Sequence, residues 1–127
     1  MNVLELPFPP SVNTYWRHPN KGKLAGRHLI SEKGREYRQA VIDEAGRYQL
    51  PRLTGGLSVH IQAFPPDRHR RDLDNLLKGL LDGLVHAQLI EDDSHIDQLS
   101  IERGVVCKGG LVRVFISKSE ENGYGAA

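Results

Sequence analysis

The sequence has a single cysteine, Cys107, and no apolar run near the ~20 residues that a membrane-spanning helix needs. One cysteine excludes an internal disulfide and is typical of a protein kept in a reducing compartment. The N-terminus also lacks the basic and then apolar pattern of a secretory signal peptide. These absences predict a soluble, cytoplasmic protein with no membrane partner.

Other features are also missing. The sequence has no internal repeat and no glycine-rich phosphate-binding pattern of the P-loop type, which disfavours a nucleotide cofactor. The formal net charge is only +1, but residues 1–40 carry seven Lys or Arg side chains against three Asp or Glu, so the remainder is net acidic. A basic surface beside an acidic pocket is expected where metal ions sit between carboxylates and phosphates. Chance segregation of charge gives the same imbalance.

The length of 127 residues suits one compact domain and is too short for two. We expect this domain over residues 1–117, followed by a polar, frayed tail over 118–127. The predicted elements follow the order β-α-β-α-β-β. This order is typical of a mixed α+β fold in which two main helices pack on a mixed sheet that ends in a C-terminal antiparallel hairpin.

Local patterns place these elements. Strands are predicted over residues 3–6, 57–63, 98–106 and 111–117, with a short additional one over 27–30; in the second of these, apolar residues alternate with polar ones. Gly109-Gly110 favours the hairpin. Ser31 is a predicted N-cap for a helix that ends before Pro51. A leucine-rich stripe from Leu73 to Val85 predicts the second helix, of about four turns.

The densest concentration of charge lies at residues 67–78, Asp67-Arg68-His69-Arg70-Arg71-Asp72-Leu73-Asp74-Asn75-Leu76-Leu77-Lys78. Two aspartates stand one residue apart at the start of the second predicted helix, and Lys78 follows one turn later. Mg²⁺ prefers a few carboxylate oxygens and keeps other positions for water and phosphate, while arginines suit phosphates. The alternative is that Asp72 or Asp74 only caps the helix. A cap accounts for one aspartate, but not for two together with Arg71 and Lys78.

Asp74, Lys78 and Asp82 are spaced four residues apart, so they share one face of this helix. Asp74 and Lys78 are therefore expected to reach the same phosphate and its metal. Asp82 is the weaker candidate, because an ion pair with Lys78 explains it without catalysis.

Two further segments mix residue types suited to DNA. Asn13, Tyr15, Trp16 and Arg17 combine polar, aromatic and cationic groups suited to sugars and unstacked bases, although the tryptophan is at least as easily explained as a lid on the core. Lys33, Arg35 and Arg38 share the polar face of the first long helix, which is either a DNA-facing surface or an ordinary solvated face.

An acidic turn, Glu91-Asp92-Asp93, follows the second helix and on composition alone is most simply solvated. Asp93 reaches Asp72 and Asp74 only if residues 88–93 run back beside the helix, because the helix carries the chain about 20 Å away. Otherwise Asp93 serves the partner subunit's site. We expect the first arrangement.

Taken together, these motifs resemble the RusA family of Holliday junction resolvases. The resemblance is carried by Pro9-Pro10-Ser11-Val12-Asn13, the basic run, Asp72-Leu73-Asp74-Asn75-Leu76 with Lys78, and Glu91-Asp92-Asp93. It implies a Mg²⁺-dependent endodeoxyribonuclease, with Mn²⁺ as a substitute metal, that resolves four-way junctions in recombination and repair. It also implies a homodimer and a bacterial or phage setting.

The resemblance implies three metal-binding and catalytic aspartates, Asp72, Asp74 and Asp93, assisted by Lys78 and by Arg71 as a DNA contact. His69 departs from the family pattern, in which an arginine is more usual. The remaining candidates are DNA contacts at Asn13, Arg17, Arg68 and Arg70, and secondary site residues at Asn75 and Asp92. Two other classes stay open: a non-catalytic branched-DNA-binding protein with the same fold, and a metal-dependent phosphohydrolase acting on small substrates.

Overall fold

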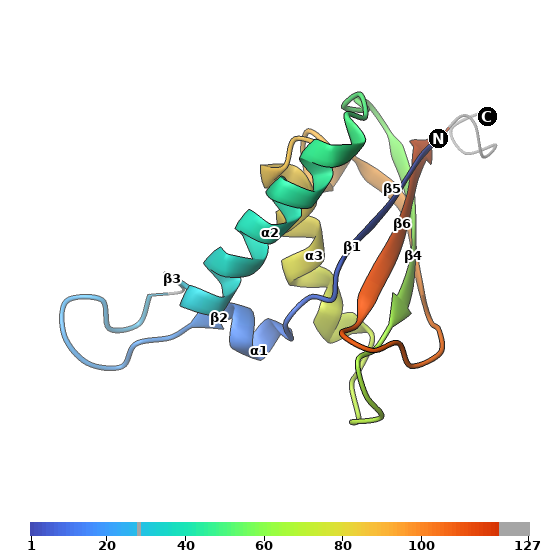
Figure 1. Cartoon of the computed structure of the whole chain (residues 1–127). Coiled ribbons are helices and arrows are strands. Elements are labelled where there is room, and N and C mark those ends of the chain that lie inside the picture. The colour runs from blue at the N-terminus through green and yellow to red at the C-terminus, as the bar shows by residue number, and fades with distance from the viewer. Residues whose placement is uncertain (28, 120–127) are drawn as a thin grey trace.

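The computed structural model describes residues 1–27 and 29–119. Its elements are β1 (Asn2–Pro7), α1 (Val12–Tyr15), β2 (Trp16–Arg17), β3 (Leu29–Ile30), α2 (Glu32–Tyr48), β4 (Leu57–Phe64), α3 (Asp74–His86), the 3₁₀ turn η1 (Asp93–His95), β5 (Ile96–Arg103) and β6 (Leu111–Lys118). The helices lie on one face of the main sheet (Figure 1). Two main helices on a mixed sheet confirm the predicted α+β class.

The main sheet has the strand order β1-β6-β4-β5, with β4 and β5 parallel and the other neighbours antiparallel. The predicted C-terminal hairpin is therefore wrong, because β5 and β6 are not neighbours. The chain leaves β5 at the sheet edge, passes the end of β4, and enters the gap between β4 and β1. Burial gives the physical reason: β6 buries Val112, Val114 and Ile116 on its inner face, whereas Leu99 on β5 remains 39% exposed.

The core fills the space between the inner sheet face and the two long helices. The alternation predicted for β4 is confirmed, since its odd-numbered residues are buried. On α3, Leu76, Leu80 and Leu84 are buried, as the leucine stripe predicted. Gly83 lets α2 approach α3 closely, because a Cβ there would lie 3.1 Å from Cγ2 of Val41.

One end of the domain gathers the segments that carry the predicted site. The loop from β4 to α3, the start of α3, α1 and the connection from β5 to β6 all lie at this end (Figure 1). A βαβ unit, β4-α3-β5, therefore places the basic loop beyond the carboxyl end of β4, where ligands of such sheets usually bind.

The described structure continues for two residues beyond residue 117, where the domain is predicted to end. Lys118 closes β6, and Ser119 is buried with its hydroxyl donating to Oδ2 of Asp97 over 2.7 Å. Residues 120–127 of the predicted tail lie outside the described residues. Among the described residues, no helix combines the length and apolarity needed to cross a membrane.

Candidate active site

A hollow of about 550 Å³ opens at the start of α3 (the Asp72 hollow). One wall comes from the segment after β1, and the other from the loop that enters α3. Its lining residues are Phe8, Pro9, Pro10, Ser11, Asn13, Thr14, Arg70, Arg71, Asp72, Asn75 and Leu76. The fold thus brings Asp72 together with three predicted DNA contacts, Asn13, Arg70 and Arg71, and with the secondary candidate Asn75.

Arg71 is held in place at this hollow. Its Nη1 atom donates to Oδ1 of Asp67 over 2.7 Å, and its guanidinium lies 5.5 Å from the centroid of the Phe8 ring. The Arg71 guanidinium, followed by the backbone N–H of His69, lowers the pKa of Asp67 to about 2. Asp67 therefore stays charged at neutral pH and orders the basic loop. Neither Phe8 nor Asp67 was assigned a role from sequence, because each acts by holding the Arg71 side chain, and that contact is visible only in the structure.

The aspartates at the start of α3 are not helix caps. The N-cap position is Leu73, with no side-chain capping bond, whereas Ser31 caps α2 by accepting from the N–H of Gly34. Asp72 and Asp74 are both exposed, and within residues 1–27 and 29–119 neither carboxylate has a hydrogen-bond or ion-pair partner. The capping interpretation is wrong, and both carboxylates are open to a ligand.

A second hollow, of about 250 Å³, lies further along α3 (the Lys78 hollow). It is lined by Trp16, Lys78, Asp82, Val85, Asp92 and Asp93. Asp93 therefore lies beside α3 of its own chain, as the predicted return of residues 88–93 requires. It meets the helix near Lys78 and not at Asp72, and the described part of the chain contains no group of three His, Cys, Asp or Glu placed to hold a metal ion. The joint action of Asp72, Asp74 and Asp93 stays a prediction.

Asp92 has a local structural role in η1. Its Oδ1 atom accepts from the N–H of Ser94 over 2.9 Å, and this bond lowers the pKa of Asp92. The Asp92 carboxylate therefore stabilises the turn that carries Asp93.

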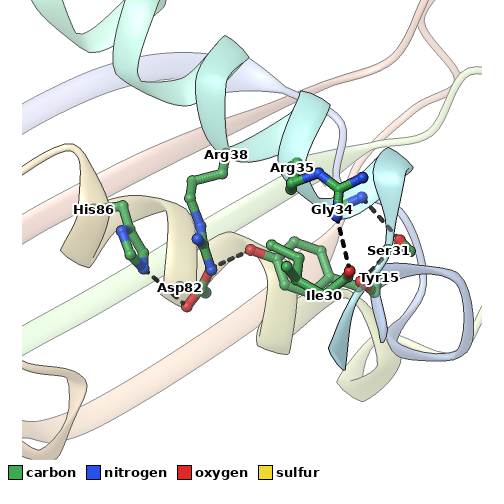
Figure 2. A network of polar contacts seen from close by, with 8 residues as sticks. All are labelled: Tyr15, Ile30, Ser31, Gly34, Arg35, Arg38, Asp82 and His86. Atoms are coloured by element: carbon green, nitrogen blue, oxygen red, sulfur yellow. Dashed lines mark hydrogen bonds and ion pairs between the residues drawn. The ribbon is translucent and has the colours of Figure 1, made fainter. Parts of the chain in front are cut away.

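Asp82 does not pair with Lys78, contrary to the interpretation from spacing. Its Oδ2 atom accepts from Nη2 of Arg38 over 2.9 Å and from Nε over 3.1 Å (Figure 2). Arg38 is consequently neither a DNA-facing nor a freely solvated side chain. The spacing argument missed this pair because Arg38 and Asp82 lie on different helices.

Tyr15 also belongs to this network. Its ring is fully buried, and its hydroxyl donates to Oδ2 of Asp82 (Figure 2). Burial and then Asp82 raise the pKa of Tyr15, so the phenol is neutral. Tyr15 therefore cannot stack on a base, and that interpretation is wrong. Trp16 packs partly buried against the core, its ring centroid 5.1 Å from that of Tyr15, which supports the lid interpretation.

A third hollow, of about 340 Å³, lies across the basic loop from the Asp72 hollow (the Arg103 hollow). It is lined by Pro65, Asp67, Arg68, His69, Arg70, Arg71, Arg103, Gly104 and Val106. Arg68 belongs to this basic surface, whereas Arg17 on β2 lines none of the three hollows. Arg103 was missed from sequence because its place beside the loop depends on the parallel pairing of β5 with β4.

Comparison with known proteins adds independent information. The family model of endodeoxyribonuclease RusA matches residues 7–117. The crossover junction endodeoxyribonuclease rusA of Enterobacteria phage HK97 is 42% identical over 116 residues, which is 91% of this chain and 92% of that protein. The proteins of the same name from Escherichia coli (strain K12) and Enterobacteria phage 82 are 34% and 35% identical, again with 91% and 92% coverage.

Proposed function

Since the chain belongs to the RusA family of crossover junction endodeoxyribonucleases, we propose that it resolves four-way junctions by two paired, symmetric cuts that depend on Mg²⁺. Its activity is that of a Holliday junction resolvase, an enzyme of DNA recombination and repair. The observation that carries the mechanism is the Asp72 hollow, where an open carboxylate faces Asn13 and two arginines.

The donor set fits a hard cation. Asp72 and Asp74 offer carboxylate oxygens that the described chain does not occupy, and Asp93 offers a third beside Lys78. Mg²⁺ commonly uses only one or two carboxylates and completes its shell with water and phosphate oxygens, so a preformed protein cage is not required. When bound, Mg²⁺ supplies positive charge that stabilises the scissile phosphate under attack by water.

The side chains have separate tasks in this proposal. Arg71, fixed by Asp67 and Phe8, holds a strand phosphate at the edge of the Asp72 hollow. Lys78 neutralises charge on the phosphate as it is cut. Asn13 and Arg70, from opposite walls, keep the strand in the hollow, and Arg68 contacts the backbone from the Arg103 hollow. Asn75 supports the strand or a water near Asp72.

Two cuts placed symmetrically across a junction need two equivalent sites. A two-fold homodimer supplies them, and two-fold dimers are the commonest oligomers. Recognition then rests on the shape of the branch and on phosphate contacts, so affinity falls steeply as salt rises.

The test is cleavage of an end-labelled four-way junction, compared with a linear duplex of the same sequence, in Mg²⁺ and in EDTA. We expect paired symmetric cuts in the junction alone, lost in EDTA and in Asp72→Asn, but retained in Asp43→Asn, a matched change on the exposed surface of α2. Tight junction binding without cleavage would instead establish a non-catalytic binder. If the linear duplex is cut as fast as the junction, the proposed selectivity for junctions is wrong.

A further inference from the structure

Lys78 and Asp82 stand one turn apart on α3 and line the same hollow. A lysine and an aspartate at this spacing ordinarily form an ion pair on a helix surface. Yet within residues 1–27 and 29–119, the Lys78 ammonium makes no ion pair or hydrogen bond, and the side chain is exposed. Lys78 is therefore unpaired in the described structure, although the Asp82 carboxylate lies within its reach.

The reason lies in the surroundings of Asp82. Its Oδ2 atom accepts two hydrogen bonds from Arg38 on α2 and one from Tyr15 on α1, and its Oδ1 atom lies 3.6 Å from Nε2 of His86 (Figure 2). The side chains of Arg38 and Asp82 are only 26% and 23% exposed, so solvent screens this pair less than a surface one. The Oδ2 atom of Asp82 is thus bound by groups from α2 and α1, and among the described residues no ion pair joins Asp82 to Lys78.

Arginine suits this task because it stays protonated and offers a forked set of donors. Burial by itself lowers the pKa of Arg38, but hydrogen bonds and charge from Asp82 raise it above its ordinary value. The buried, neutral Tyr15 hydroxyl adds a donor without adding charge. Together these two side chains supply three hydrogen bonds to Oδ2 of Asp82.

We propose that Arg38 is a positioning residue that holds Asp82 away from Lys78 and so leaves the Lys78 ammonium available to the substrate phosphate. This inference rests on the proposed function, in which Lys78 acts on the phosphate. Without Arg38, Asp82 retains its charge but loses its main partner, and the flexible Lys78 side chain turns toward it. Arg38 thereby acts on catalysis through Asp82 and Lys78, without touching DNA.

A suppressor experiment tests this role. Arg38→Met removes the charge while keeping much of the side-chain volume, and single-turnover cleavage of the four-way junction should fall roughly tenfold, since an interaction with the scissile phosphate is lost. Adding Asp82→Asn removes the charge that captures Lys78, so the double variant should recover to within about threefold of the original rate. Junction affinity, measured without Mg²⁺, should change much less than the cleavage rate in both.

The controls separate positioning from stability. Arg113→Met removes another paired arginine, whose Nη2 lies 2.7 Å from Oε2 of Glu5 on the opposite face of the sheet, and should leave cleavage unchanged. Urea unfolding, measured at the assay temperature, checks that each variant is folded under the conditions of the cleavage assay. If Arg38→Met does not fold, Arg38→Lys replaces it, with a smaller defect that Asp82→Asn should again relieve.

The outcomes are distinguishable. A folded double variant that is as slow as Arg38→Met, or slower, overturns the positioning role, because removal of the Asp82 charge would then fail to return the Lys78 ammonium to the substrate phosphate. Lys78→Met should abolish cleavage in the original chain and in the recovered double variant. If Lys78→Met cleaves normally, the proposed function of Lys78 fails, and the inference that rests on it fails too.

Discussion

The guanidinium of Arg103 donates a hydrogen bond of 2.9 Å from Nη2 to the backbone carbonyl of Arg71, the residue that precedes Asp72. This bond joins the end of β5 to the loop that enters α3. Charge-assisted bonds of this type are stronger than neutral ones. The exposed Asp72 therefore follows a backbone position that a residue outside its own loop holds in place.

Arg103→Met should loosen this loop and lower junction cleavage roughly tenfold, because small displacements of catalytic groups are costly. Arg103→Lys should lower cleavage by less than Arg103→Met does, since lysine retains a cationic donor but lacks the arginine fork. Single-turnover cleavage provides the measurement, and Arg47→Met, at an exposed position near the end of α2, is the control. Unchanged cleavage in Arg103→Met would mean that the Asp67–Arg71 contact alone suffices to hold the loop.

Asp74→Asn should abolish cleavage while changing the free energy of unfolding by no more than about 1 kcal/mol. No capping bond is lost at this position, and only the interaction of the charge with the helix N-terminus is removed. Ser31→Ala provides the contrast, since loss of a true cap costs about 1 kcal/mol or more. Urea unfolding and junction cleavage, measured on both variants, check the prediction. A severely destabilised Asp74→Asn protein would contradict it.

Gly79→Ala should destabilise the protein by about 1 kcal/mol or more, because a Cβ there would lie 2.9 Å from Cδ1 of the buried Tyr15 ring. The ring cannot move freely, since its hydroxyl is bonded to Asp82. Gly46→Ala on α2 is the matched change, with no atom within 4 Å of the added Cβ, and should stabilise the protein by up to about 1 kcal/mol. The midpoints of urea unfolding measure both. If Gly79→Ala instead stabilises the protein as much as Gly46→Ala does, the Tyr15 ring moves aside to accommodate the added Cβ.

The Asp67–Arg71 contact should give a pH-dependent contribution to stability. The pKa of Asp67 is lowered from 3.8 to about 2 in the folded protein, so the contribution is complete above about pH 4 and is lost as the pH falls through 2. The difference in unfolding free energy between the original chain and Asp67→Asn should therefore be constant near neutral pH and shrink toward pH 2. A difference that does not vary with pH would show that Arg71 does not hold this carboxylate.

Features that depend on neighbouring residues were predictable from sequence. The alternation in β4, the leucine stripe of α3 and the Ser31 cap each follow from a repeat or a capping preference within a few positions. Part of the motif from Asp67 to Lys78 also comes together in space, because residues close in sequence supply much of the lining of the Asp72 hollow.

Features that depend on which distant segments meet were decided by the tertiary structure. Spacing favoured a Lys78–Asp82 pair, but the approach of α2 gave Asp82 a partner 44 residues away in Arg38. Gly109-Gly110 favoured a hairpin, but burial of the apolar face of β6 placed it between β1 and β4. The sequence by itself determined the elements and their chemistry, since periodicity and capping are local. Only packing decided which charges are satisfied, since that depends on long-range contacts.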